Sequence, residues 1–105
     1  MKEKQALYKI GNGELIIMLP KEFDHHSAKE ITEQSDWYII SSGIQTVIFD
    51  FKNTEFMDSS GVGAVIGRYK LVKGRGAVKA LNINPSIDRI LTISGLYKIM
   101  EKVEK

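Results

Sequence analysis

The chain has 105 residues, of which 43% are hydrophobic, and its formal net charge at pH 7 is +2. These values predict a single globular domain and exclude a disordered chain, a fibrous repeat and a strongly basic nucleic-acid-binding protein. Cysteine is absent, which excludes disulfide bonds and thiolate chemistry and fits a reducing compartment.

The first part of the chain predicts a hairpin followed by a helix. The apolar runs at residues 7–10 and 14–19 are separated by a Gly-Asn-Gly sequence, which is typical of a hairpin loop. Ser27 and Glu30 match a capping box, in which the serine hydroxyl and the glutamate carboxylate satisfy free N–H groups of the first helical turn. The helix is therefore expected to begin there, with Asp24 as an alternative cap, and to end at Gly43.

The remainder alternates strands with helices. Residues 46–51 have the β-branched and aromatic composition of a buried strand, and a helix is predicted over residues 59–73. The inward face of this helix is expected to carry Val62, Val65, Ile66, Tyr69 and Val72. A strand at 77–83 and a third helix capped by Asn84 follow, and residues 96–100 fit either a short strand or the start of a helix.

This order predicts one α/β domain over residues 1–105, with a mixed sheet of four or five strands packed against helices. The longest continuous apolar run, residues 15–19, is far shorter than the roughly 18 residues that a membrane-spanning helix needs. The charged N-terminus lacks the apolar stretch of a signal peptide. We therefore expect a cytoplasmic protein that contacts neither membranes nor nucleic acid directly.

The helix predicted at 59–73 contains three glycines near its start, Gly61, Gly63 and Gly67. Each glycine inside a helix costs about 1 kcal/mol relative to alanine, so the three do not serve stability alone. They keep the early turns nearly free of side chains, which lets another backbone approach, either the adjacent strand or a second protein. We expect residues 57–68 to form the working surface.

The segment before this helix combines an apolar pair with capping residues. Asp58, Ser59 and Ser60 belong to the types that accept hydrogen bonds from the free N–H groups of a first turn. A helix N-terminus also accommodates a phosphate, so serines in an approachable turn are suitable targets for a kinase. The pair Phe56 and Met57 is expected to be exposed and to act as a docking contact.

Four short blocks make the sequence recognisable. They are residues 24–28 (DHHSA), 56–63 (FMDSSGVG), 67–70 (GRYK) and 93–99 (ISGLYKI). Together and in this order they closely resemble the anti-sigma factor antagonists of the STAS (sulfate transporter and anti-sigma factor antagonist) superfamily, most of all the sporulation group that acts on anti-sigma F factors. The Asp-Ser-Ser-Gly motif alone is weak, whereas the four blocks together are specific.

The resemblance implies a partner-switching cycle. An unphosphorylated antagonist binds an anti-sigma factor that is also a serine kinase, which frees the sigma factor for RNA polymerase. The kinase phosphorylates the antagonist with ATP, the phosphorylated form dissociates, and a serine phosphatase restores it. The family motif assigns the phosphate to Ser59 and a structural role to Ser60. The partner-binding residues implied by the resemblance and by their nearness in sequence are Asp24, Phe56, Met57, Asp58, Ser60, Gly61 and Gly63.

Two other functions remain open from the residues. His25 or His26 would carry an acid-labile phosphate in a phosphocarrier protein, and a scaffold domain would bind partners regardless of Ser59. Adjacent helical residues point about 100° apart, so the two histidines are not expected to hold one metal ion. The chain shows no nucleophile–base–orienter set and no Gly-x-x-x-x-Gly-Lys-Ser/Thr phosphate loop. We therefore expect no catalytic residue, metal or cofactor.

Overall fold

The computed structural model describes residues 5–103 and contains a five-stranded sheet with the strand order β1-β2-β4-β6-β7. These strands are β1 (Leu7–Gly11), β2 (Glu14–Met18), β4 (Thr46–Asp50), β6 (Val78–Leu81) and β7 (Met100–Val103). β1 and β2 form the predicted antiparallel hairpin, whereas β2, β4, β6 and β7 are parallel to one another. The predicted mixed sheet is therefore confirmed, and it has five strands.

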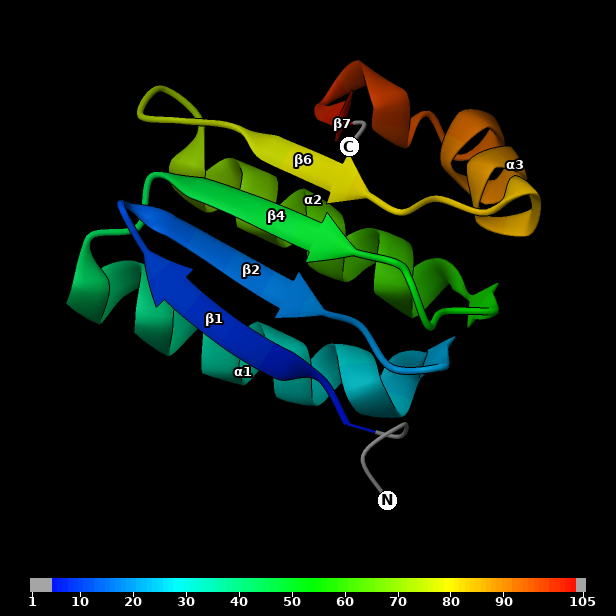
Figure 1. Ribbon diagram of the computed structural model, residues 1–105, viewed down its shortest axis with the longest axis horizontal. Helices are drawn as coiled ribbons and strands as arrows, with labels where there is room; N and C mark the ends of the chain where they lie inside the picture. The colour runs from blue at the N-terminus through cyan, green and yellow to red at the C-terminus, as the bar shows by residue number, and fades with distance from the viewer. Residues whose placement is uncertain (1–4, 104–105) are drawn as a thin grey trace.

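The helices connect the parallel strands. α1 (His25–Ser42) and α2 (Ser59–Val72) lie side by side on one face of the sheet, and α3 (Pro85–Ile93) lies beyond the end of β6 (Figure 1). The segment that fitted either a strand or a helix is a 3₁₀ turn, η2 (Leu96–Lys98), followed by β7. Within residues 5–103, no helix is both long enough and apolar enough to cross a membrane.

Side-chain alternation on the strands decides which face of the sheet is buried. On β2 and β4, fully buried residues alternate with half-buried ones. The residues on the helix-facing side are at most 1% exposed, and they are Leu15, Ile17, Val47, Phe49, Val78 and Ala80. The core therefore lies between the sheet and the α1–α2 layer, because successive residues of a strand point to opposite faces.

α1 begins three residues earlier than a Ser27 cap predicts, so the capping-box prediction was wrong and the alternative cap was right. Its N-cap is Asp24, whose Oδ1 accepts hydrogen bonds from the backbone N–H groups of His26 (3.1 Å) and Ser27 (3.2 Å). The Ser27 hydroxyl accepts the reciprocal bond from the backbone N–H of Asp24 (3.1 Å). Ser27 is thus the third helical residue, with a serine where a capping box usually has Glu or Gln. Gly43 ends the helix in the left-handed conformation, as predicted.

The buried face of α2 differs in part from the predicted one. Val65 and Val72 are fully buried as expected, but Val62, Ile66 and Tyr69 are only half-buried. The other buried positions are Gly61, Ala64 and Arg68. The reason is that α2 packs against α1 as well as against the sheet, so a single apolar stripe does not describe its contacts. The third helix begins as predicted, with Asn84 accepting a hydrogen bond from the N–H of Ile87 (2.9 Å).

Candidate partner-docking site

A second, two-stranded sheet positions the starts of α1 and α2. β3 (Glu22–Phe23) pairs in parallel with β5 (Phe56–Met57), and Phe23 lies opposite Met57. An aspartate follows each strand and caps the next helix, Asp24 for α1 and Asp58 for α2. The register therefore brings the two caps together at one end of the main sheet. Neither strand was predicted from the sequence, although both segments share the pattern of an apolar residue followed by Asp.

Asp58 satisfies the first turn of α2 without help from the serines. Its Oδ1 accepts hydrogen bonds from the backbone N–H groups of Ser60 (2.8 Å) and Gly61 (3.2 Å). Ser59, the first helical residue, is exposed, and no hydrogen bond to its hydroxyl occurs within residues 5–103; Ser60 is half-buried. Of the two serines, Ser59 is therefore the one that a second protein can reach from solvent.

The other cap carries a stabilised carboxylate. The largest influence on the Asp24 carboxyl is a hydrogen bond from the backbone N–H of Ser27, which lowers its pKa from the ordinary value. Burial opposes this effect, and a hydrogen bond from the N–H of His26 adds to it, so the pKa remains lowered. The rings of His25 and His26 lie 4.0 Å apart between centroids, so they do not diverge as predicted. Both histidines are exposed in the first turn, where no preceding turn restricts their side chains. No group of three His, Asp or Glu residues in the described chain converges on a point where a metal ion would fit.

The glycines of α2 divide into two kinds. A Cβ added to Gly61 would lie 2.7 Å from the backbone oxygen of Phe23, so Gly61 allows β3 to approach the helix. At Gly63 and Gly67 an added Cβ would meet nothing within 4 Å, so their smooth surface is open. The close approach that the glycines predicted is thus internal at Gly61, and only the other two face outward.

The predicted exposed apolar pair is exposed only at its first residue. The side chain of Phe56 is 49% exposed, whereas that of Met57 is 4% exposed and belongs to the core. The alternation of β5 explains the difference, because successive residues of a strand point to opposite sides. The prediction that Met57 is exposed was therefore wrong.

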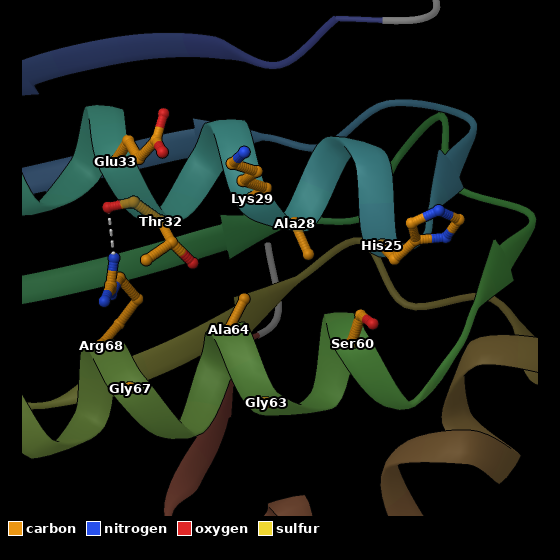
Figure 2. Close-up of a pocket in the computed structure, with 10 residues that line it drawn as sticks. All are labelled: His25, Ala28, Lys29, Thr32, Glu33, Ser60, Gly63, Ala64, Gly67 and Arg68. Carbon is orange, nitrogen blue, oxygen red and sulfur yellow. Dashed lines mark hydrogen bonds between the residues drawn. The ribbon is translucent and has the colours of Figure 1, made fainter.

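A groove of about 450 Å³ runs between α1 and α2. Figure 2 shows His25 and Lys29 on the α1 side, with Ser60 at the start of α2 opposite His25. Gly63 and Gly67 line the α2 side, where the missing side chains leave space between the helices. The groove thus begins at the helix starts that carry both caps and continues along the surface formed by the open glycines.

Arg68 closes the far end of the groove and ties α2 to α1. Its guanidinium donates hydrogen bonds to the backbone oxygen of Thr32 (2.8 Å; Figure 2) and to the hydroxyl of Ser35 (2.6 Å), and it lies 2.8 Å from the Asp36 carboxylate. The residue is only 4% exposed. Burial lowers the pKa of the guanidinium, and the negative charge of Asp36 opposes that effect. Sequence reasoning placed Arg68 on the working surface, but the structure gives it a role in holding the two helices together.

Comparison with known proteins places the whole described chain in one family. The STAS domain family matches residues 5–105. An anti-sigma F factor antagonist from Paenibacillus polymyxa is 42% identical over 89 residues, which is 84% of this chain and 76% of that protein. Among solved structures, the unphosphorylated form of the anti-sigma factor antagonist SpoIIAA is similar with a TM-score of 0.83 and 30% identity, covering 93% of this chain and 87% of that one.

A solved structure of the phosphorylated form of Bacillus SpoIIAA is also similar, with a TM-score of 0.74 and 30% identity, covering 93% of this chain and 90% of that one. The fold of the present chain therefore resembles that of SpoIIAA both with and without the phosphate.

Proposed function

This chain belongs to the STAS domain family, and from that premise we propose that it is an anti-sigma factor antagonist switched off by phosphorylation of Ser59. In its unphosphorylated form it binds an anti-sigma factor that is also a serine kinase, and this binding releases a sigma factor. The observation that carries the proposal is the exposed position of Ser59 as the first residue of α2, beside the α1–α2 groove.

The similar proteins support the regulatory part of the proposal. The relative from Paenibacillus polymyxa is an anti-sigma F factor antagonist, and SpoIIAA has been solved both unphosphorylated and phosphorylated. By analogy, we propose a sporulation cycle in which the kinase adds the phosphate and a serine phosphatase removes it. A partner that holds a sigma factor works beside RNA polymerase, so the proposal also puts the protein in the cytoplasm.

The geometry supports a docking surface at the common end of α1 and α2. Asp24 and Asp58 lie at the helix starts, Phe56 presents an exposed ring there, and Ser60 and Gly63 line the groove. We propose that these five residues contact the partner.

Met57 and Gly61 belong to the same proposed set but are buried. They act by positioning: the Met57 side chain anchors β5 in the core, and Gly61 lets Phe23 pack against the first turn of α2.

The switch follows from electrostatics at this surface. A phosphate on Ser59 adds about −1.5 to −2 charges at pH 7. The first turn of α2 already has the Asp58 carboxylate as its cap, so the added charge meets a negative neighbour. Leaving an unpaired charge in a closed interface costs about 3–5 kcal/mol, which corresponds to roughly a hundred- to a few-thousand-fold in affinity. No refolding of the antagonist is required.

The test compares wild type, Ser59→Ala and Ser59→Asp for binding to the cognate anti-sigma kinase, with ATP-dependent phosphorylation followed in parallel. We expect Ser59→Ala to bind without taking phosphate and Ser59→Asp to bind at least about tenfold more weakly. Ser60→Ala is the matched control and should still be phosphorylated. Phosphorylation of Ser59→Ala would move the site elsewhere, and equal binding by all variants would favour a scaffold domain.

The chemical stability of the phosphate separates the serine switch from a phosphocarrier. Phosphoserine survives acid treatment, whereas a phosphate on His25 or His26 does not. Both histidines are exposed, so they are accessible to a phosphate donor. We expect the phosphate on the wild-type protein to be acid-stable and to be retained in a His25→Gln/His26→Gln double variant. An acid-labile phosphate that this double variant loses would replace the antagonist proposal.

A further inference from the structure

The outer edge of β1 is free. β1 lies at one end of the strand order and, within residues 5–103, it pairs only with β2. At the start of β2, the backbone oxygen of Gly13 accepts a hydrogen bond from the N–H of Thr46 in β4 (3.2 Å). Just after β2, the N–H of Leu19 donates to the backbone oxygen of Asp50 in β4 (3.0 Å). Odd-numbered positions along β2 therefore direct their backbone groups to β4, and even-numbered positions direct theirs to β1.

The register decides which backbone groups of β1 remain unpaired. The even-numbered residues of β2 lie opposite Leu7, Lys9 and Gly11, so these three make the hydrogen bonds of the hairpin. The N–H and C=O groups of Tyr8 and Ile10 consequently point away from the sheet. They have the spacing that a further antiparallel strand would need.

β1 lacks the features that usually protect an edge strand. Exposed edges are commonly blocked by charged residues, by proline or by a bulge. β1 pairs with β2 residue for residue, so it has no bulge; it contains no proline, and Lys9 is its one charged residue. β7, at the opposite edge of the sheet, carries exposed Glu101 and Lys102 side by side. An extended chain is therefore expected to add to β1 rather than to β7.

A cavity of about 420 Å³ lies beside this edge, on the side of α1. Its lining residues, which we call the aromatic cavity, are Glu33, Gln34, Trp37 and Tyr38. The rings of Tyr38 and Tyr8 are 5.3 Å apart between centroids, so the cavity borders β1, and α1 runs alongside β1 in Figure 1. Tyr8 lies opposite Ile17, which is buried under the helices, so the side chains of Tyr8 and Ile10 point to the α1 side. A residue added opposite Tyr8 would direct its side chain over the aromatic cavity.

The chemistry of the cavity favours a cation. The Trp37 side chain is 66% exposed, and the face of an indole ring attracts an ammonium or guanidinium group. Glu33 and Glu30 are exposed and take part in none of the ion pairs found within residues 5–103. The pKa of the Tyr8 hydroxyl is raised to about 12, mainly by burial and to a smaller extent by the charge of Glu30, so Glu30 also lies near this edge.

We propose that β1 and the aromatic cavity bind an extended segment of a partner protein, which adds as an antiparallel strand and places an arginine or lysine side chain over Trp37. The backbone groups of Tyr8 and Ile10 supply the ladder of hydrogen bonds, and the cavity selects the side chain. Of the residues that line the cavity, Glu33 alone also lines the α1–α2 groove. This site is therefore separate from the surface proposed for the anti-sigma partner.

Charge disfavours a second copy of this chain as the occupant. In the register that pairs all five residues of β1 with those of another copy, Lys9 would lie opposite its own counterpart. The same arrangement would bring the acidic side of α1, with Glu30 and Glu33, next to itself. A basic segment of another protein meets neither repulsion.

The test uses a short capped peptide in which Thr alternates with Arg, added to the full chain without kinase or nucleotide, so its outcome is independent of the role of Ser59. Fluorescence anisotropy of the labelled peptide should give a dissociation constant of about 0.1–1 mM. Trp37 is the only tryptophan of the chain, so its own fluorescence should change with the same dissociation constant when unlabelled peptide is added. A peptide with Glu in place of Arg should bind at least about tenfold more weakly.

Two matched pairs of variants locate the contact. Ile10→Pro removes the outward N–H but no bond to β2 and should weaken peptide binding at least about fivefold, whereas Ile10→Thr keeps the N–H and should stay within about threefold of wild type. Glu33→Lys should weaken binding at least about fivefold, and Glu101→Lys, with the same charge change at the opposite edge, should stay within about twofold. Circular dichroism checks that each variant folds.

Amide hydrogen exchange tests the strand addition directly. The N–H groups of Tyr8 and Ile10 should exchange quickly in the free protein and slowly with the peptide, whereas Lys9 should be protected in both. The proposal is overturned if the peptide does not bind up to about 5 mM, or if binding survives both Ile10→Pro and Glu33→Lys. Protection of Tyr8 and Ile10 that rises with protein concentration alone would assign the edge to a second copy and would overturn it too.

Discussion

The backbone of Phe23 lies directly against Gly61, so that a Cβ on Gly61 would come within 2.7 Å of the Phe23 carbonyl oxygen and 3.1 Å of its ring. The same carbonyl accepts a hydrogen bond from the backbone N–H of Asp58 (3.2 Å). β3 therefore packs onto the first turn of α2, and this contact holds together the two segments that end in the capping aspartates.

Alanine at the buried and at the open glycine of α2 should have different effects on stability. Gly61→Ala should destabilise the protein by about 1–3 kcal/mol, because the clash is with backbone that cannot move aside. Gly63→Ala, two residues away on the same helix, should be neutral or stabilising by up to about 1 kcal/mol, since nothing lies within 4 Å of the new methyl group. Urea denaturation of both variants measures the difference. Equal destabilisation would contradict the distinction between the internal and the open glycine.

A larger side chain at Gly63 should block the groove without unfolding the protein. Gly63→Leu fills space between α1 and α2, so binding to the anti-sigma partner should weaken by at least about tenfold while stability is retained. Lys70→Leu adds the same side chain at an exposed α2 position that does not line the groove, and should bind as wild type. Binding isotherms with both variants measure the effect. Unchanged binding by Gly63→Leu would remove the groove from the docking surface.

The order and type of the main elements could be predicted because each has a local signal: the hairpin loop, the β-branched strand at 46–51 and the Asn84 cap. β3 and β5 could not, because two-residue strands are too short to show alternation. For the same reason the burial of Met57 was missed, since only its place on β5 separates it from the exposed Phe56. Local patterns thus describe long elements, while the site depends on short segments brought together by the fold.

Arg68 is charged and yet buried, because it is paired with groups on another helix. Charged residues are almost never fully buried unless they are paired, and the partners of Arg68 lie on another helix more than 30 residues away. A polar residue at a buried position of α1, Ser35, accepts a hydrogen bond from the guanidinium. Sequence alone does not show that these two inward positions meet.

Loss of the Arg68 side chain should destabilise the packing of α1 against α2. Arg68→Ala removes the buried stem and leaves the Ser35 hydroxyl and the Thr32 carbonyl without this donor. Because Asp36 is 44% exposed and can be rehydrated, we expect a loss of about 2–3 kcal/mol rather than the full cost of an isolated buried charge. Arg75→Ala, at an exposed arginine, is the control and should change stability by less than about 0.5 kcal/mol. A similar small effect at both positions would contradict the anchoring role.

The contact between α3, η2 and β7 should make stability depend on pH. The Tyr97 hydroxyl donates a hydrogen bond to Asp88 (2.5 Å), and the Lys102 amine lies 3.3 Å from the same carboxylate. The pKa of Asp88 is lowered, mainly by the hydrogen bond from Tyr97 and to a smaller extent by Lys102. The pKa of Tyr97 is raised, mainly by burial and to a smaller extent by Asp88. Each group is therefore stabilised in the form that predominates at neutral pH.

The signs of the two shifts define a window of pH. A carboxyl whose pKa is lower in the folded state stabilises the protein above its unfolded value of about 3.9, and this contribution is lost as the pH falls through the folded value. A tyrosine whose pKa is raised contributes fully below about pH 10 and loses its contribution above that value.

We expect Asp88→Asn to be less stable than wild type at pH 7, with the difference shrinking below about pH 4. Denaturation of wild type, Asp88→Asn and the control Tyr69→Phe across this range would show it, and a difference that stays constant into strong acid would rule out Asp88 as its source.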